Sequence, residues 1–246
     1  MPCLTLLLLL PPVVMGCRRI RRGGAAAWRL YRRLSVFLGA VILLSMAAQE
    51  TLLHLSGQLH WSTGLPLHLC SLMGVIALPA LMTRRDTLLH ALLCAGLPGA
   101  ALALLFPAVA VTPWPRLTAF FFCLMHAGVV LAPLLPLSLG WRPRPAGAFS
   151  TFLFLLAAGC LAAIINRLTG GNYLFLAGPV AGTPLVLLHR WGGHVYRLLL
   201  ALLAALLLTG EAALISLLTR RRRKRPPARE NRPKIGERCG RLQNPR

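Results

Sequence analysis

The stretch Leu65 to Leu72, with the sequence LPLHLCSL, places three reactive side chains within about one helical turn. His68 is an acid/base group near neutral pH, and Cys70 and Ser71 follow it by two and three residues. A Ser or Cys activated by a neighbouring His is the minimum for acyl transfer. Ser71 shares a helix face with His68 and Cys70 does not, so the identity of any nucleophile stays open.

Other ionisable residues lie inside apolar segments, where each costs on the order of 3 kcal/mol and is a candidate functional residue by default. Glu50 and His54 are four residues apart and share one helix face, so Glu50 is predicted to orient His54 or His68. His126 lies deeper, about 15 Å below Arg116 at 1.5 Å per residue. Each of these residues also fits a simpler role, because buried polar groups hydrogen-bond across membrane helices as part of packing.

These side chains are predicted to converge on one pocket that opens to the outer side of the membrane. The predicted catalytic residues are His68, His126, Glu50 and His54. The predicted substrate-binding residues are Cys70, Ser71, Arg116, Asn166, Asn172 and Tyr173. No metal or cofactor is expected, since the seven cysteines are scattered without the spacing of a zinc site or a disulfide framework.

The composition requires lipid as the solvent of most of this chain. Hydrophobic residues make up 57% of the sequence and charged residues 13%, whereas a soluble domain has about 25% charged residues. The net charge of +22 is confined to loops and the C-terminal tail, so it predicts contact with anionic lipid headgroups and argues against nucleic acid. The chain is therefore expected to be an integral membrane protein.

Six apolar segments predict an all-α transmembrane bundle, at residues 35–57, 66–83, 87–107, 117–136, 147–166 and 195–218. Residues 3–16 are apolar but short and are interrupted by Pro11 and Pro12, so the number of spans is six or seven. The predicted organisation is a short apolar segment with a basic loop over 1–34, a membrane domain over 35–218 and a basic disordered tail over 219–246.

Charge predicts the orientation of these spans. If the loop at 17–33 is cytoplasmic, 23 of the 27 Lys and Arg residues lie on the cytoplasmic side. The remaining four are Arg116, Arg167, Arg190 and Arg197. The positive-inside rule then predicts a cytoplasmic C-terminus, with the basic loop and tail against anionic lipids.

Four stretches of the sequence resemble the YwaF-type bacterial membrane proteins. They are Leu65 to Ser71, Gly99 to Pro107, Phe120 to Phe122 with His126, and Asn172 to Leu176. That family is uncharacterised, so the resemblance implies a multi-pass protein of the bacterial inner membrane rather than an activity. The chain departs from the family at Leu102, where a Gln is usual, and after Leu176, where a Lys-Pro pair is missing.

The sequence is more distantly similar to animal polytopic enzymes that move fatty acyl groups on phospholipids. In those enzymes a cysteine directly before a histidine is the proposed nucleophile, and the matching residue here is Leu67 before His68. Two classes of function therefore stay open. One is an enzyme acting on lipid acyl esters, a hydrolase or acyltransferase, and the other is a binding or transport protein for a small polar ligand or protons.

Overall fold

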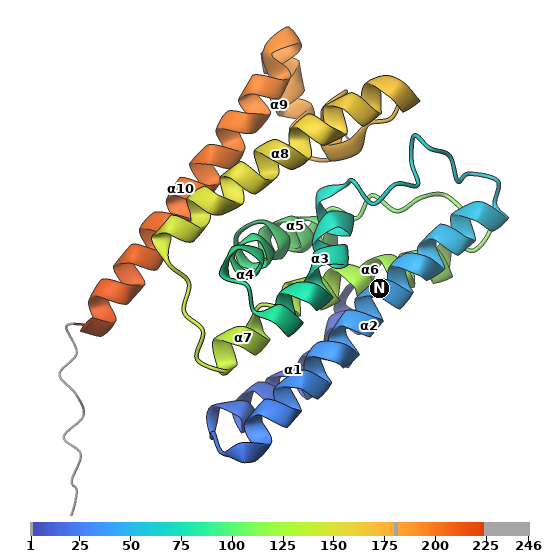
Figure 1. Cartoon of the computed structure of the whole chain (residues 1–246). Helices are drawn as coiled ribbons and strands as arrows, with labels where there is room; N and C mark the ends of the chain where they lie inside the picture. The colour runs from blue at the N-terminus through green and yellow to red at the C-terminus, as the bar shows by residue number, and fades with distance from the viewer. Residues whose placement is uncertain (1, 180–181, 224–246) are drawn as a thin grey trace, which may run out of the picture.

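The computed structural model describes residues 2–179 and 182–223, and every regular element within these ranges is helical (Figure 1). The predicted all-α class is therefore confirmed. Within these described ranges, five helical stretches are long and apolar enough to cross a membrane: Ala26–Leu55, Asp86–Leu105, Pro115–Ser138, Pro145–Thr169 and Leu185–Leu217. A shorter apolar helix, Leu69–Thr83, adds to these five and completes a polytopic helix bundle.

The helices follow one another in the order α1 Pro2–Arg21, α2 Ala25–Leu55, α3 Leu69–Thr83, α4 Asp86–Ala91, α5 Leu97–Leu105, α6 Pro115–Leu131, α7 Leu134–Ser138, α8 Pro145–Thr169, α9 Leu185–Gly192 and α10 Tyr196–Arg223. A π-helical turn, η1 (Leu92–Gly96), joins α4 to α5, and 3₁₀ turns form η2 (Tyr173–Phe175) and η3 (Gly193–Val195). Proline is the first residue of both α6 and α8. A backbone N–H at this position would have no partner within the helix, so the missing N–H of proline costs no hydrogen bond. Gly170, with φ of 69°, ends α8 in the left-handed conformation that glycine favours.

The N-terminal region differs from the sequence prediction. The predicted basic loop at 17–33 is mostly helical, because α1 continues to Arg21 and α2 begins at Ala25. Arginine, leucine and alanine favour helix, so the arginine-rich ends extend the apolar helices instead of unwinding. At the other end α10 continues to Arg223, and the rest of the predicted tail, 224–246, lies outside the described residues.

The core lies where α2, α3 and α6 pack closely through glycine. A Cβ atom on Gly128 of α6 would lie 2.6 Å from the Ile42 side chain of α2, and one on Gly74 of α3 would lie 2.6 Å from Met46 Sδ. Ile42 is fully buried in this contact. Small residues at such positions let helix backbones approach closely, which is the usual means of association in membranes.

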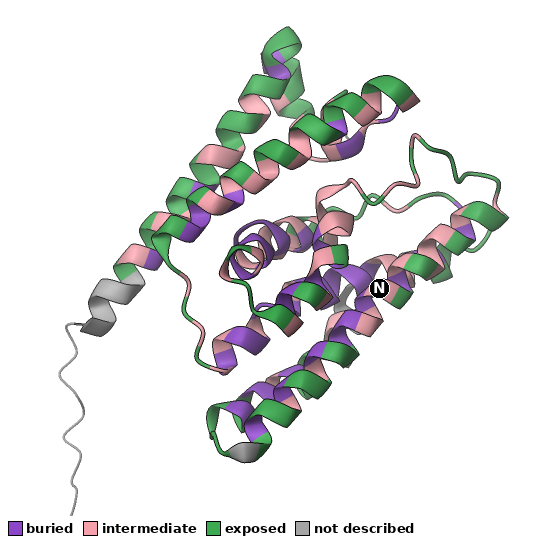
Figure 2. Ribbon diagram, viewed as in Figure 1, coloured by how far each residue is buried: buried purple, intermediate pink, exposed green. Residues whose placement is uncertain are grey.

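Helices α8 and α10 run side by side and present their outer faces away from the rest of the bundle (Figures 1 and 2). Large apolar side chains are exposed along both helices, including Phe149 and Ile164 of α8 and Leu198 and Leu206 of α10. Exposed apolar faces of this extent mark contact with another apolar phase. In a chain with these spans, that phase is the lipid bilayer.

A polar cluster fixes the first turn of α8 to α4. The Asp86 carboxylate accepts a hydrogen bond from Trp141 Nε1 at 2.9 Å and a second from the Arg144 guanidinium. The buried ring of His90 lies edge-on to Trp141, with 5.0 Å between ring centroids. His90 has no role predicted from the sequence, because its position near the end of a span does not reveal these partners.

The connections separate into two ends of the bundle. The α1–α2 turn and the α7–α8 connection lie at one end, and the α2–α3 and α5–α6 connections lie at the opposite end (Figure 1). The first end has the arginine-rich segments, and the second contains His68 in the α2–α3 connection. The candidate site therefore lies at the end of the bundle with few basic residues.

Candidate functional site

His68 is the residue that directly precedes α3, and its extended backbone (φ −71°, ψ 149°) begins the helix. Its imidazole packs against two aromatic rings, and its centroid lies 5.1 Å from that of Tyr173 and 5.3 Å from that of Phe175. Within the described residues, its Nδ1 is buried and has no hydrogen-bond partner. Since Nδ1 is buried, Nε2 is the ring nitrogen that remains to interact with a ligand.

Tyr173 ties the α2–α3 connection to the segment after α8. Its hydroxyl donates a hydrogen bond to the Trp61 carbonyl oxygen at 2.7 Å and accepts one from the Leu65 N–H at 3.0 Å. The Tyr173 side chain is completely buried. The two stretches that supported the family resemblance, around His68 and around Tyr173, therefore form one unit.

The two predicted asparagines shape this unit from within. The Asn166 amide accepts a hydrogen bond from the Tyr173 N–H at 2.7 Å and donates one to the Tyr173 carbonyl oxygen at 3.0 Å. The Asn172 amide donates to the Gly178 carbonyl oxygen at 2.9 Å and accepts from the Ala177 N–H at 2.9 Å. Both amides are thus bonded to the chain: Asn166 of α8 holds Tyr173 against that helix, and Asn172 closes the turn to Ala177 and Gly178.

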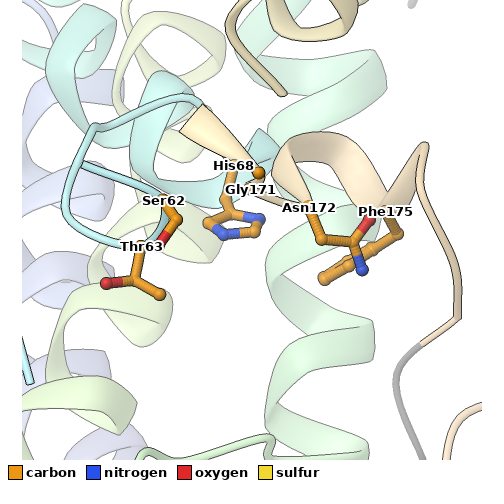
Figure 3. A pocket seen from close by; sticks show the side chains of 7 residues that line it. Ser62, Thr63, His68, Gly171, Asn172 and Phe175 are labelled. Carbon is orange, nitrogen blue, oxygen red and sulfur yellow. The ribbon is translucent and has the colours of Figure 1, made fainter. Parts of the chain in front are cut away.

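A hollow of about 340 Å³ lies beside the His68 ring (Figure 3). Its lining residues come from the α2–α3 connection and the segment after α8: Ser62, Thr63, His68, Gly170, Gly171, Asn172 and Phe175. This volume is at the lower end of the range for small-molecule sites, which is about 300–1,000 Å³. Ser62, Thr63 and Phe175 are not among the predicted site residues, although only Gly64 separates Thr63 from the LPLHLCSL stretch.

Glu50 lies at the level of His68 by the register of α2 against α3. Gly39 packs on Leu78 and Gly74 packs on Met46, so the two helices are antiparallel and residue 50 is opposite the start of α3. Among the described residues, Glu50 Oε2 is buried without a hydrogen-bond partner, as His68 Nδ1 is. The predicted partner His54 is exposed, and no ion pair between it and Glu50 forms in this part of the chain.

His126 and Arg116 do not line the hollow beside His68. The His126 ring is buried on α6, where Nδ1 lies 2.7 Å from the carbonyl oxygen of Phe122 and the two rings are 4.1 Å apart. Arg116 is exposed near the start of the same helix, beside Trp114. The structure therefore brings together His68, Asn166, Asn172 and Tyr173 and leaves these two residues apart from them.

The predicted nucleophiles do not line the hollow either. Cys70 Sγ faces Gly99 of α5, where a Cβ atom would lie 3.9 Å from the sulfur. Ser71 follows it in the first turn of α3 and is likewise not a lining residue. Among the described residues, no three His, Cys, Asp or Glu side chains gather as metal ligands. The site is thus one imidazole in a hollow that Ser62 and Thr63 also line, with the partly buried carboxylate of Glu50 at the same level.

The bundle of apolar helices, with exposed apolar faces and polar connections at its two ends, is that of a polytopic α-helical membrane protein. The family model of the TMEM164 family matches residues 1–209, and the chain belongs to this family. No curated protein and no solved structure matches the chain. The comparisons do not confirm the YwaF-type resemblance, the similarity to acyltransferases or the bacterial inner membrane that the sequence analysis expected.

Proposed function

We propose that this protein is a membrane enzyme that cleaves or transfers an acyl ester of a lipid at the His68 end of the bundle. The observation that supports this proposal most directly is the His68 ring beside a hollow that is also lined by the side chains of Ser62 and Thr63. An imidazole next to hydroxyl groups is the arrangement that general-base catalysis of acyl transfer requires. This function includes hydrolysis when the acceptor is water and acyl transfer when it is another alcohol.

The proposed reaction uses His68 as both base and acid. Nε2 takes the proton of the attacking hydroxyl while its oxygen forms a bond to the ester carbonyl carbon. The bond from that carbon to the leaving alkoxide oxygen then breaks, and the alkoxide takes the proton back from Nε2. Nδ1 is buried, and the Glu50 carboxylate at the same level stabilises the positive charge on the ring while it is protonated.

An amphiphilic substrate fits the surroundings of the hollow. Trp61 and Leu168, close in sequence to lining residues, leave 77% and 76% of their surface exposed. A hollow of about 340 Å³ accommodates an ester group and part of a headgroup, while acyl chains extend along such apolar surfaces. These exposed side chains favour a lipid over a substrate that is soluble in water.

The test uses the full-length protein in nanodiscs that contain phosphatidylcholine with a fluorescent acyl chain. Release of the labelled fatty acid, or its transfer to added lysophospholipid, is followed by mass spectrometry. We expect His68→Ala to reduce turnover about 10²-fold or more, whereas His194→Ala, which changes an exposed histidine near α10, leaves it unchanged. Absence of both products from the wild-type protein, or equal turnover by His68→Ala, contradicts the proposal.

The alternative function is that of a binding or transport protein for a small polar ligand or protons. It is favoured by the commitment of both asparagine amides to the chain, which leaves few free polar groups for a reaction. Saturable binding of a short-chain ester or alcohol without turnover would support this alternative. The same nanodisc samples distinguish the two functions. His68→Ala is expected to lose binding in both cases, but the wild-type protein forms products only if it is an enzyme.

We also propose that the arginine-rich end faces the cytoplasm and contacts anionic lipids. Arg84 lies 4.9 Å above the Trp28 ring, and both side chains are exposed at this end. Such a pair suits the headgroup region, where tryptophan and basic side chains gather. Cysteine labelling from either side of sealed vesicles tests the orientation. Comparison of bound phosphatidylserine and phosphatidylcholine after purification tests the lipid contact.

A further inference from the structure

We propose that Ser62 is the hydroxyl that attacks first, so that an acyl group is carried on this serine between two half-reactions. This inference rests on the proposed function. Ser62 and His68 line the same hollow, Ser62 from the middle of the α2–α3 connection and His68 from its end (Figure 3). In the described part of the chain the Ser62 hydroxyl makes no hydrogen bond and is not enclosed by other atoms.

The neighbouring hydroxyl is occupied. Thr63 Oγ1 accepts a hydrogen bond from the His60 N–H at 3.3 Å and lies 3.3 Å from the carbonyl oxygen of Gln58. These bonds stabilise the turn that precedes α3. Of the two side-chain hydroxyls that line the hollow, only that of Ser62 is therefore available to react, among the residues that the structure describes.

The backbone around Ser62 is fixed on both sides. The carbonyl of Trp61, directly before it, accepts a hydrogen bond from the Tyr173 hydroxyl, and the N–H of Leu65, three residues after it, donates to the Tyr173 hydroxyl oxygen. A Cβ atom on Gly171 would lie only 2.8 Å from the Ser62 carbonyl oxygen, so the opposite wall holds the turn closely. A nucleophile on such a tethered turn keeps its position relative to the base, which effective catalysis requires.

The chemistry of this route is complete with the groups named. The proton of Ser62 Oγ passes to His68 Nε2, and Oγ forms a bond to the ester carbonyl carbon of the lipid. The ester C–O bond breaks, and the leaving alcohol takes the proton from His68. Water or a second alcohol then attacks the acyl-serine with His68 as base, which releases the acyl group and returns the proton to Oγ.

The residues nearer to His68 in the sequence do not fit the role of nucleophile. Cys70 faces α5 through Gly99, and residue 67, directly before His68, is a leucine. Ser62 lies six residues before His68 and outside any helix, so helical spacing does not relate the two residues. The turn between Leu59 and Leu67 brings it to the hollow.

The test is covalent labelling of the full-length protein in nanodiscs with a fluorophosphonate probe, followed by peptide mass spectrometry. We expect labelling of Ser62 that disappears in Ser62→Ala and in His68→Ala. Ser56→Ala is the matched control, because Ser56 belongs to the same connection but its hydroxyl is bonded to the Leu53 carbonyl oxygen at 2.9 Å. Labelling in this control is expected to equal that of the wild type.

Lipid turnover by the same variants separates this inference from the proposed function. Wild-type turnover that persists in Ser62→Ala overturns the role of Ser62 and leaves His68 as a base that activates water directly. Label on a residue other than Ser62 also overturns it. A wild-type protein with neither label nor products overturns the proposed function itself.

Discussion

The backbone N–H of Arg144 donates a hydrogen bond to Nε2 of His90 at 2.9 Å. Nε2 is therefore unprotonated, and the hydrogen of the neutral ring is on Nδ1, which donates to the Asp86 carbonyl oxygen at 2.7 Å. The ring thus joins the first turn of α4 to the first turn of α8. Because α8 extends from this contact to Asn166, the same helix that is fixed at the arginine-rich end also positions Tyr173 at the candidate site.

Gly147 leaves the space that this contact needs. A Cβ atom at residue 147 would overlap the His90 ring, which is almost fully buried and cannot move away. We expect Gly147→Ala to destabilise the protein by about 1–3 kcal/mol, the usual cost of overpacking. Thermal unfolding in nanodiscs measures this change. The matched control is Gly159→Ala on the same helix, which meets no atom within 4 Å and should be neutral or slightly stabilising.

Asp86 is expected to act mainly through its hydrogen bond to Trp141. The Arg144 side chain is 70% exposed, so its ion pair with Asp86 contributes little. Asp86→Ala, which removes the acceptor of the Trp141 hydrogen bond, should therefore lower the free energy of unfolding by about 1 kcal/mol, and Arg144→Ala by clearly less. Denaturation monitored by tryptophan fluorescence compares the two variants. An Arg144→Ala loss equal to or larger than that of Asp86→Ala would show that the ion pair dominates.

Most of the fold could be predicted from apolar segment length. The predicted spans at 87–107 and 147–166 match the helical stretches Asp86–Leu105 and Pro145–Thr169 within a few residues. The span at 117–136 matches Pro115–Ser138 in extent, although Pro133 divides it into α6 and α7. The main difference is at 17–33, where hydropathy falls but helix propensity does not, and a hydropathy pattern alone cannot distinguish a charged helix end from a loop.

The candidate site could be predicted only in part. His68 and Tyr173 belong to stretches that the sequence analysis selected, and the structure places their rings in contact. Their partners Trp61 and Leu65 bond through backbone atoms, which leave no signature in side-chain type. The sequence predicts that His126 converges on the same pocket as His68, but its position along the chain does not state which way the side chain points around its helix.

Gly171 is predicted to keep the hollow open. A Cβ atom there would lie 2.8 Å from the Ser62 carbonyl oxygen and 3.1 Å from Tyr173 Cε2. We expect Gly171→Ala to lower lipid turnover and fluorophosphonate labelling together, with a loss of about 1–3 kcal/mol in stability. Gly178→Ala is the control, because nothing lies within 4 Å of an added Cβ. Equal labelling of the two variants would show that the space at Gly171 is not needed.

His126 provides a test of which histidines act in the reaction. The sequence analysis predicts a catalytic role, but the ring is only 3% exposed, its Nδ1 bonds to the carbonyl of its own helix and it does not line the hollow. In His126→Leu we therefore expect the leucine side chain to fill the space of the imidazole and to leave the substrate site unchanged. Turnover per folded molecule should then fall less than about tenfold. Loss of a general acid or base typically costs about 10²–10⁴-fold. Turnover normalised to the folded fraction, measured beside His68→Ala in the same nanodiscs, decides the question, and a fall of about 10²-fold or more would make His126 a catalytic residue.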